Sequence, residues 1–398
     1  MNHTVNKNDL FSSCFFSMTL SFLGENMKIG MVCYPSYGGS GTIATELGKV
    51  LGVRGHQVHF ISYSIPYRLR DYSENVYFHE VSMMKYPLFE FPPYSLALAE
   101  KMVTVAEKEA LDLIHVHYAI PHSTSAYLAK QMLNGKPKII TTLHGTDVTL
   151  VGSDESYYRI NKFSIEQSDG VTTVSEYLKR ETEEKFHIKM PIKVIPNFVD
   201  TNCFSHTHRC RAKCLFAPKN ERIIMHVSNF RPVKRIEDVI SAFALINAEI
   251  PSKLLMVGDG PMMSVALRMV EKLEISSNVT FLGKQDDVAG LLPIADLFLI
   301  PSESESFGLS ALEAMSCEVP VIGTNVGGLP EVIEHGDTGY LVEVGDVEAM
   351  AEWAKRLLKD DDLHEKMGKR ARQVVLEKFH QNKIVDMYED YYKEILME

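Results

Sequence analysis

Cysteine and tryptophan are scarce in this chain of 398 residues. It holds six cysteines and one tryptophan, and the cysteines follow no regular spacing. A secreted domain that is stabilised by disulfides needs paired cysteines. The few, irregularly spaced cysteines therefore favour a reducing compartment, and we expect a cytoplasmic protein. Positively charged residues are also relatively scarce, because 52 acidic residues outnumber 41 lysines and arginines and give a net charge of −11. Nucleic acid is therefore not an expected partner, and anionic ligands must be met by local cations.

Long hydrophobic runs are missing as well. One apolar stretch, residues 10–23, is interrupted by serines and is too short to cross a bilayer, so we expect no membrane insertion. It resembles the central part of a signal peptide but has no clear cleavage site, and Met27 immediately begins the strand-like run MKIGMVCY. We therefore expect residues 1–26 to be a dispensable extension, with Met27 as the functional start.

From Lys28 onward, short apolar runs alternate with helical segments. Such alternation predicts right-handed βαβ units, and hence parallel sheets with helices on both faces. The chain is too long for one ordinary core, and its two series of apolar runs are separated near Pro196–Ser205, where proline, asparagine and aspartate break the pattern. We expect an α/β protein with two doubly wound, Rossmann-like domains.

Two glutamates, Glu305 and Glu313, mark a predicted strand-to-helix turn. The helix is opened by Phe307, Gly308 and Leu309, and Glu313 lies about one turn inside it. A helix start has unpaired N–H groups and a partial positive charge, which stabilise an anion such as a diphosphate. Carboxylates beside that anion can accept hydrogen bonds from sugar hydroxyls. The alternative is an ordinary strand–turn–helix unit with solvated glutamates, because short motifs recur by chance.

A glycine-rich turn, residues 35–42, follows the first predicted strand and contains Gly39 and Ser40. Glycines allow a ligand to approach the backbone closely, and the helix that begins near Ile43 can hold phosphate at its start. The turn is not the dinucleotide fingerprint, because no acidic residue is well placed about 20 residues later. The alternative is a plain tight turn.

Three cations, Arg231, Lys234 and Arg235, follow the predicted strand that ends at Ser228. Fixed cations stabilise the negative charge that develops on a departing diphosphate. A charge run of this kind is more often simply solvated. Its place directly after a strand, ahead of the two glutamates, favours a phosphate role.

Together these motifs resemble the donor site of the retaining nucleotide-sugar glycosyltransferases of family 4, which have the GT-B fold. The continuation GTNVGGLPEVI after the glutamates supports the resemblance, which covers the chain from Met27 to its end. It implies an acceptor-binding domain at residues 27–198, a donor-binding domain at 199–378, a cleft between them, and a last helix, 379–398, that crosses back to the first domain. It also implies transfer without an enzymic nucleophile, a metal or a cofactor.

The resemblance implies catalytic roles for His144, Arg231, Lys234 and Glu305. The donor-binding residues it implies are Gly39, Ser40, Asn229, Arg231, Lys234, Glu305, Phe307, Gly308, Leu309 and Glu313. Many relatives place an arginine five residues before the lysine, where this chain has Asn229, so the division of labour between Arg231 and Lys234 stays open. A lone histidine such as His144 is more often structural, and we do not expect it to act as a general base.

Within the family, the chain resembles enzymes that join N-acetylglucosamine from UDP-GlcNAc to the hydroxyl of L-malate with an α linkage, in bacillithiol biosynthesis. Malate is a small dianion, so its pocket needs cations and hydroxyl donors. By resemblance to a member that acts on an inositol phosphate, the acceptor residues are Lys85, Tyr118, Thr146 and Arg159. For Lys85 and Arg159 the alternative of an exposed cation carries equal weight.

Other functions stay open at this point. A lipid or polysaccharide acceptor is one alternative, and a catalytically silent sugar-nucleotide-binding protein is another. The apolar run at residues 89–98 is the candidate lipid-facing surface, but we expect it to pack at the cleft. An isomerase of the 2-epimerase type lacks this glutamate pair and is disfavoured. A homo-oligomer is left open.

A cysteine and histidine cluster between the predicted domains invites a metal-binding interpretation. It consists of Cys203, His206, His208, Cys210 and Cys214. Thiolates and imidazoles suit zinc, but the spacing does not follow the usual paired arrangement. We expect ordinary surface residues.

Overall fold

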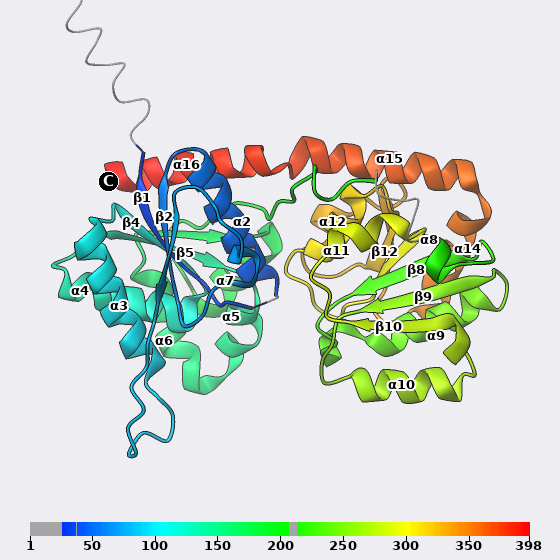
Figure 1. Cartoon of the computed structure of the whole chain (residues 1–398), viewed down its shortest axis with the longest axis horizontal. Coiled ribbons are helices and arrows are strands. Elements are labelled where there is room, and N and C mark those ends of the chain that lie inside the picture. Colours follow the sequence, from blue (N-terminus) through cyan, green and yellow to red (C-terminus); the bar gives the residue numbers. More distant parts are fainter. Residues whose placement is uncertain (1–25, 37, 207–212) are drawn as a thin grey trace, which may run out of the picture.

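The computed structural model describes residues 26–36, 38–206 and 213–398, so nearly all of the predicted extension at residues 1–26 lies outside the described residues. Two α/β halves lie side by side, and two consecutive helices run along the same edge of both (Figure 1). The predicted α/β class with two parallel-sheet halves is confirmed.

The first half of the described chain is built on a seven-stranded parallel sheet in the order β3-β2-β1-β4-β5-β6-β7. Strand β4 is buried from end to end, and β5 is buried from Ile139 onward, as expected of a sheet with helices on both faces. The strands are β1 (Lys28–Val32), β2 (Gln57–Ser62), β3 (Val76–Glu80), β4 (Leu113–His117), β5 (Lys138–Leu143), β6 (Gly170–Thr173) and β7 (Lys193–Val194). The helices are α2 (Gly39–Val53), α3 (Tyr94–Glu109), α4 (Thr124–Met132), α5 (Thr146–Thr149), α6 (Glu155–Glu166) and α7 (Glu176–Phe186).

The second half of the described chain carries a six-stranded parallel sheet in the order β10-β9-β8-β11-β12-β13. Its strands are β8 (Arg222–Val227), β9 (Ser252–Val257), β10 (Val279–Gly283), β11 (Leu297–Ile300), β12 (Val321–Thr324) and β13 (Gly339–Val342). The helices are α8 (Lys213–Phe216), α9 (Ile236–Asn247), α10 (Met263–Lys272), α11 (Val288–Leu291), α12 (Leu309–Ser316), α13 (Leu329–Val332) and α14 (Val347–Lys359). The predicted boundary at residues 198 and 199 falls between β7 and β8.

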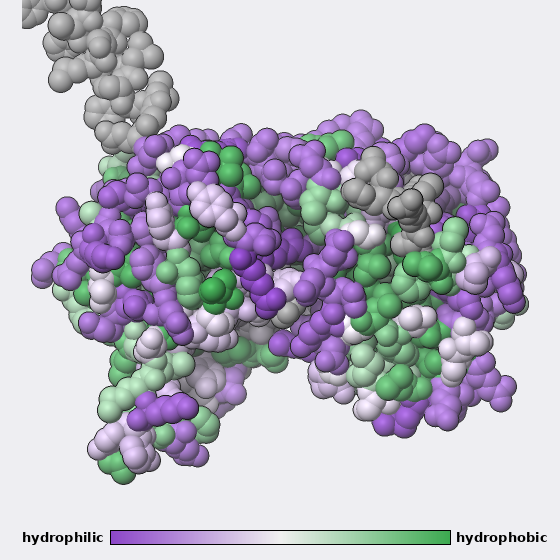
Figure 2. Space-filling model, in the orientation of Figure 1, coloured by the Kyte–Doolittle hydropathy of each residue, from purple (hydrophilic) through white to green (hydrophobic). Residues whose placement is uncertain are grey.

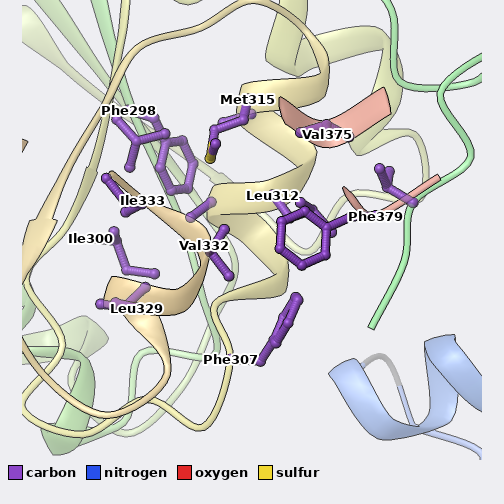
Figure 3. Close-up of a cluster of buried hydrophobic side chains, with 14 of the residues drawn as sticks. Phe298, Ile300, Phe307, Leu312, Met315, Leu329, Val332, Ile333, Val375 and Phe379 are labelled. Carbon is purple, nitrogen blue, oxygen red and sulfur yellow. The ribbon is translucent and has the colours of Figure 1, made fainter. Parts of the chain in front are cut away.

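The helix that carries Glu313, α12, is anchored in the core of the second half. Leu312 and Met315 point from α12 into an apolar cluster, and Phe307 lies beside Phe379 at its edge (Figure 3). The two phenylalanine rings meet edge to face with their centroids 5.7 Å apart. Burying each large apolar side chain contributes about 1.5–3 kcal/mol, so the start of α12 is held in a fixed place.

The last two helices, α15 (Asp361–Lys378) and α16 (Gln381–Met397), pass from the second half to the first (Figure 1). Tyr388 and Tyr392 of α16 are buried against the first sheet, and the Tyr392 hydroxyl lies 2.7 Å from His115 Nδ1. Arg54 at the end of α2 adds ion pairs with α16, one of them to Glu389 at 2.5 Å. The C-terminal helix therefore belongs structurally to the first core.

The apolar run at residues 89–98 does not pack at the cleft, so that prediction is wrong. Phe91 is 79% exposed and Phe89 is 47% exposed, in a loop that projects from the first half (Figures 1 and 2). Prolines at positions 92 and 93 delay the start of α3 to Tyr94, and only the later part of the run, at Leu98, reaches the core. None of the helices in the described ranges combines the length and apolar character that a membrane crossing requires.

Candidate active site

The starts of α2 and α12 meet between the two halves. A methyl group built on Gly39 would lie 3.8 Å from Leu309 Cδ2, and Leu309 packs against apolar clusters of both halves. The predicted donor residues Gly39, Ser40, Phe307, Gly308 and Leu309 are thus brought to one place. Two helix N-termini directed at the same region favour an anion with two charged groups, as in a diphosphate.

Lys234 and Glu305 form an ion pair beside that region. Lys234 Nζ lies 2.5 Å from Glu305 Oε2, and Ser302 Oγ donates to the same carboxylate oxygen at 3.3 Å. A backbone bond from Glu303 N to the Val233 carbonyl, 2.8 Å, holds the two loops together. The ammonium is therefore presented by a rigid loop, with its carboxylate partner beside it.

The glycines of GTNVGGLPEVI explain how the Glu305 loop is supported. Gly328 N donates to the Glu305 carbonyl at 2.9 Å. Gly327 has a φ of +58°, and a methyl group built on it would lie 1.9 Å from the same carbonyl oxygen. Only glycine allows this approach, so the two motifs form one structural unit.

Glu313 is buried and meets a cation from the opposite half. Arg68 Nη2 lies 3.5 Å from Glu313 Oε1, and Arg68 Nη1 lies 3.7 Å from Glu46 on α2. Burial raises the pKa of Glu313 to about 7, and the Arg68 charge opposes that rise. Arg68 lies in a short helical turn, Tyr67–Leu69, and no motif or strand end marked it in the sequence.

His144 follows β5 and is held from two sides. Its Nε2 is joined to His117 Nδ1 by a 2.9 Å hydrogen bond, and burial lowers the pKa of His144 to about 3. The backbone N–H groups of His144 and Gly145 donate to Asp147 Oδ1 at 3.2 and 2.8 Å. A neutral, fixed imidazole suits orientation of a substrate better than proton abstraction. His117 and Asp147 are supporting residues that sequence reasoning missed.

Tyr118, Thr146 and Ser40 come together next to His144. Tyr118 is hydrogen-bonded through its side chain to Thr146 and to Ser40, and the Arg231 charge from the other half acts on it. Burial is the main influence on Tyr118 and raises its pKa. The Tyr118 and His144 rings lie 6.0 Å apart at an angle of 19°. Hydroxyls predicted for the acceptor therefore adjoin groups predicted for the donor.

The remaining predicted residues lie at the surface. Asn229 and Arg231 are exposed in the loop after β8, Lys85 is exposed in the projecting loop, and Arg159 is exposed on α6. Within the described residues, no hydrogen bond or ion pair joins Lys85 or Arg159 to Tyr118 or Thr146. The acceptor roles of these two cations stay predictions.

The two halves touch directly around this site. A methyl group built on Gly145, whose φ is +119°, would lie 1.6 Å from Ser306 Oγ. Ser175 Oγ donates to the Ser306 carbonyl at 2.7 Å, and the Glu331 carboxylate accepts from backbone N–H groups at the start of α7 at 2.8 and 2.9 Å. The two halves are therefore in direct contact around the site, an arrangement that we term closed.

The predicted cysteine and histidine cluster has only some of its members in the described ranges, since His208 and Cys210 lie outside them. Cys203 and Cys214 are exposed free thiols, and His206 Nδ1 lies 3.0 Å from Glu318 Oε1. In the described residues, no group of three or more potential metal ligands forms around Cys203.

Each half of the chain matches a known protein family. Residues 37–202 match the family described as Glycosyltransferase Family 4, and residues 212–374 match Glycosyl transferases group 1.

Among curated proteins, the chain is 53% identical over 371 residues to the N-acetyl-alpha-D-glucosaminyl L-malate synthase of Bacillus anthracis, a match that covers 93% of this chain and 97% of the relative. It is 37% identical over 177 residues to the D-inositol 3-phosphate glycosyltransferase of Mycobacterium tuberculosis, which covers 42% of this chain and 36% of that protein.

Solved structures share the fold at lower identity. A glycosyltransferase from Rickettsia africae superposes with a TM-score of 0.78 at 24% identity, covering 94% of this chain and 99% of the other. HepE of Anabaena, solved with UDP and glucose, superposes with a TM-score of 0.79 at 19% identity, covering 92% of this chain and all of that one. The predicted GT-B fold is confirmed.

Proposed function

This chain belongs to glycosyltransferase family 4, and we propose that it transfers N-acetylglucosamine from UDP-GlcNAc to the hydroxyl of L-malate, with retention at the anomeric carbon. The product is the α-linked GlcNAc-malate, formed in the cytoplasm as the first step of bacillithiol biosynthesis. The choice of malate is supported by the 53% identity with the malate synthase of B. anthracis.

The Lys234–Glu305 pair, whose glutamate lies in the loop that precedes α12, is the observation that carries the donor role. The diphosphate lies between the starts of α2 and α12, with Lys234 and Arg231 against its outer oxygens. Glu305 accepts a hydrogen bond from a hydroxyl of the N-acetylglucosamine ring. Glu313 accepts hydrogen bonds from the ribose after Arg68 shifts aside, so the buried carboxylate has a partner in either state.

The transfer exchanges one carbon–oxygen bond for another on the same face of the sugar. The bond from the anomeric carbon to the β-phosphate oxygen breaks, and the malate hydroxyl oxygen forms the new bond from the face that UDP leaves. The departing phosphate oxygen takes the hydroxyl proton, so no protein nucleophile or base is needed. Lys234 and Arg231 stabilise the charge that grows on UDP. No metal or cofactor is part of this proposal.

Hydroxyl groups define the proposed malate site. Tyr118 and Thr146 donate to one malate carboxylate, and Lys85 and Arg159 supply positive charge when malate is bound. Substituting Arg159→Ala is expected to raise the malate KM far more than the UDP-GlcNAc KM. Arg180→Ala, which removes an exposed cation of α7, is the matched control and should change neither. Equal changes in both KM values for Arg159→Ala would refute the assignment.

The acceptor is tested directly by UDP release. The protein is incubated with UDP-GlcNAc and, in separate reactions, with L-malate, glycerate or inositol phosphate. Release with malate alone is the expected result, and Lys234→Ala should greatly reduce it because the leaving diphosphate loses one of its two cations. Release with another acceptor, or with none of the three, would reject malate as the substrate.

A lipid-borne acceptor is a second candidate, because the projecting loop exposes apolar side chains. Leu88 and Phe91 are 81% and 79% exposed, and a cavity of about 400 Å³ opens between this loop and α3, lined in part by Met83, Met84 and Phe89. Glycolipid formed from UDP-GlcNAc on lipid vesicles, and lost with Phe91→Ser, would support it. Malate turnover that is unchanged in Phe91→Ser would support malate as the acceptor.

A further inference from the structure

Two histidines lie on one face of the first sheet at its edge. His59 is on β2 and His79 is on β3, the edge strand, and the parallel register pairs His59 with Tyr77 and Ile61 with His79. Alternate residues of a strand share a face, so both imidazoles lie on the same side as Ile61. That side is covered by α3, whose last residue is Glu109.

The three side chains converge on one point. His59 Nδ1 and His79 Nε2 are 3.0 Å apart, and the planes of the two rings differ by only 26°. One potential ligand atom from each of His59, His79 and Glu109 lies within 4.8 Å of the others. Two nitrogens bound to one tetrahedral ion at about 2.0–2.1 Å lie about 3.3 Å apart, so the observed spacing needs only a small adjustment.

His59 is a buried histidine that the surrounding fold leaves partly unsatisfied. The residue is 2% exposed, yet its Nε2 has no hydrogen-bond partner among the described residues, so the imidazole is not satisfied by the fold around it. Both the hydrogen bond to His79 and an ion at Nδ1 leave Nε2 unpaired, so it is the convergence of the three side chains that favours an ion. A histidine binds a metal ion through a neutral ring nitrogen, and each of the two rings offers one at this point.

We propose that His59, His79 and Glu109 bind one divalent transition-metal ion of the zinc class. Two imidazoles and one carboxylate are ligands that zinc and its first-row neighbours prefer, whereas calcium and magnesium prefer oxygen alone. The Glu109 side chain is 27% exposed, so water can complete the coordination. The ion ties the edge strand β3 to the end of α3, on either side of the projecting loop, and takes no part in sugar transfer.

Nearby lysines oppose binding of the ion, because one of them pairs with a proposed ligand. Lys108 Nζ lies 3.3 Å from Glu109 Oε1 and lowers the pKa of that carboxyl, so the ion must displace this ammonium. Lys28 is committed elsewhere, because it donates to the Glu109 carbonyl at 3.0 Å. Lys101 also acts on His79 through its charge. Removing the competitor, with Lys108→Met, is therefore expected to tighten metal binding.

The test is a titration of the full chain, first stripped of metal with a chelator, with zinc and then with cobalt. The wild type is expected to bind one equivalent, with a cobalt absorption spectrum typical of nitrogen and oxygen ligands. His79→Gln and Glu109→Gln should each weaken zinc binding at least about tenfold, since even loss of a group that only supports a ligand weakens binding by that much. Far-UV circular dichroism of the metal-free variants verifies that they fold.

Two controls locate the ion. The double substitution Cys203→Ser and Cys214→Ser, at exposed free thiols, should leave the bound equivalent unchanged. His335→Gln, an exposed histidine of the second half, should do the same. A wild-type chain that binds no zinc at micromolar concentration overturns the proposal, as does an equivalent that survives both ligand substitutions or disappears with the cysteines. Sugar transfer should not change when the ion is removed.

Discussion

At the residue scale, burial of Glu313 favours its neutral form, whereas its proposed role is to accept hydrogen bonds from the ribose. The carboxyl is buried on α12, and burial raises its pKa from 4.5 to about 7 although Arg68 lies close by. The folded state therefore favours the protonated form. A raised pKa contributes stability that is fully present below pH 4.5 and is lost as the pH rises through about 7.

Replacing this carboxyl by an amide should remove that pH dependence. From pH 4.5 to 7.5, the free energy of unfolding of the wild type is expected to fall by up to about 3 kcal/mol relative to Glu313→Gln, at about 1.4 kcal/mol for each unit of pKa shift. Urea denaturation at a series of pH values measures the difference. Glu334→Gln, at a surface glutamate paired with Lys378, is the control. Parallel curves for wild type and Glu313→Gln would contradict the assignment.

Gly145 is the point where the first half touches Ser306 of the second. The substitution Gly145→Ala places a methyl group 1.6 Å from Ser306 Oγ and forces a non-glycine residue into a φ of +119°, so the halves cannot close. We expect kcat/KM to fall at least about a hundredfold, as loss of precise positioning can cause, and the melting temperature to fall modestly, because the backbone strain costs about 1–3 kcal/mol. Steady-state kinetics and thermal denaturation check this.

A second substitution separates the clash from the backbone strain. Ser306→Gly removes the side chain that the new methyl group meets. The double variant should recover part of the lost kcat/KM if the contact between the halves is the cause. Equal activity of the double and the single variant would show that the contact does not control closure.

The sequence indicated site residues that follow strands, because parallel strands bring their carboxyl ends to one edge. His144 and the Lys234 and Glu305 loops were found in this way, and the structure joins the latter two. Arg68 and Asp147 were missed, since each acts through a long-range or backbone contact that no local spacing encodes. Their roles depend on how the halves and loops pack.

At the element scale, the start of α7 is stabilised by the opposite half. Glu331 of α13 accepts hydrogen bonds from Glu176 N and Tyr177 N at 2.9 and 2.8 Å, where the positive end of the helix favours a carboxylate. Because this cap exists only when the halves are together, it favours the closed arrangement.

Removing the carboxylate should shift the protein towards an open arrangement. Glu331→Ala is expected to reduce the free energy that favours the closed arrangement by about 1 kcal/mol. This change raises the KM for the sugar donor roughly fivefold, with a smaller effect on kcat. Glu331→Gln, which keeps one acceptor oxygen, should lie between wild type and alanine. Glu348→Ala, at the start of α14 and away from the first half, is the matched control. An unchanged donor KM would argue against the cap.

Elements were predictable to different degrees. The alternation of apolar runs and helices predicted the two parallel sheets because buried parallel strands are nearly continuous in apolar residues. The prediction that residues 89–98 pack at the cleft was wrong, because an apolar pattern does not distinguish a buried segment from an exposed one when prolines interrupt it. The approach of Gly327 to the Glu305 carbonyl also required the structure.

At the scale of the whole molecule, a set of buried and half-buried histidines lies between the active site and the crossing helix. His144 is joined to His117, whose ring lies 4.3 Å from that of His115, and His115 reaches Tyr392 of α16. His122 Nδ1 donates to the His117 carbonyl at 2.6 Å. Acid that charges these rings therefore acts on the first core, the site and α16 together.

This set should make the protein unfold on mild acidification. Burial lowers the pKa of His115 and His144 to about 3 and of His122 to about 4, and lowers that of His117 further. A lowered histidine pKa contributes stability that is present above the unfolded value of 6.5 and is lost as the pH falls towards the folded value. Glu313, with a pKa of about 7, and Asp147, with one of about 6, act in the opposite direction but are fewer.

The net effect is uptake of about two protons or more on unfolding near pH 5.5, which corresponds to a loss of about 3 kcal/mol for each pH unit. Urea denaturation between pH 7.5 and 5 measures that slope. His122→Asn keeps a donor for the His117 carbonyl but does not titrate, so it should lower the slope by about one proton. His335→Asn, at an exposed histidine, should leave it unchanged. A free energy of unfolding that stays constant from pH 6.5 to 5 would mean that these rings are already charged, or exposed, in the folded protein.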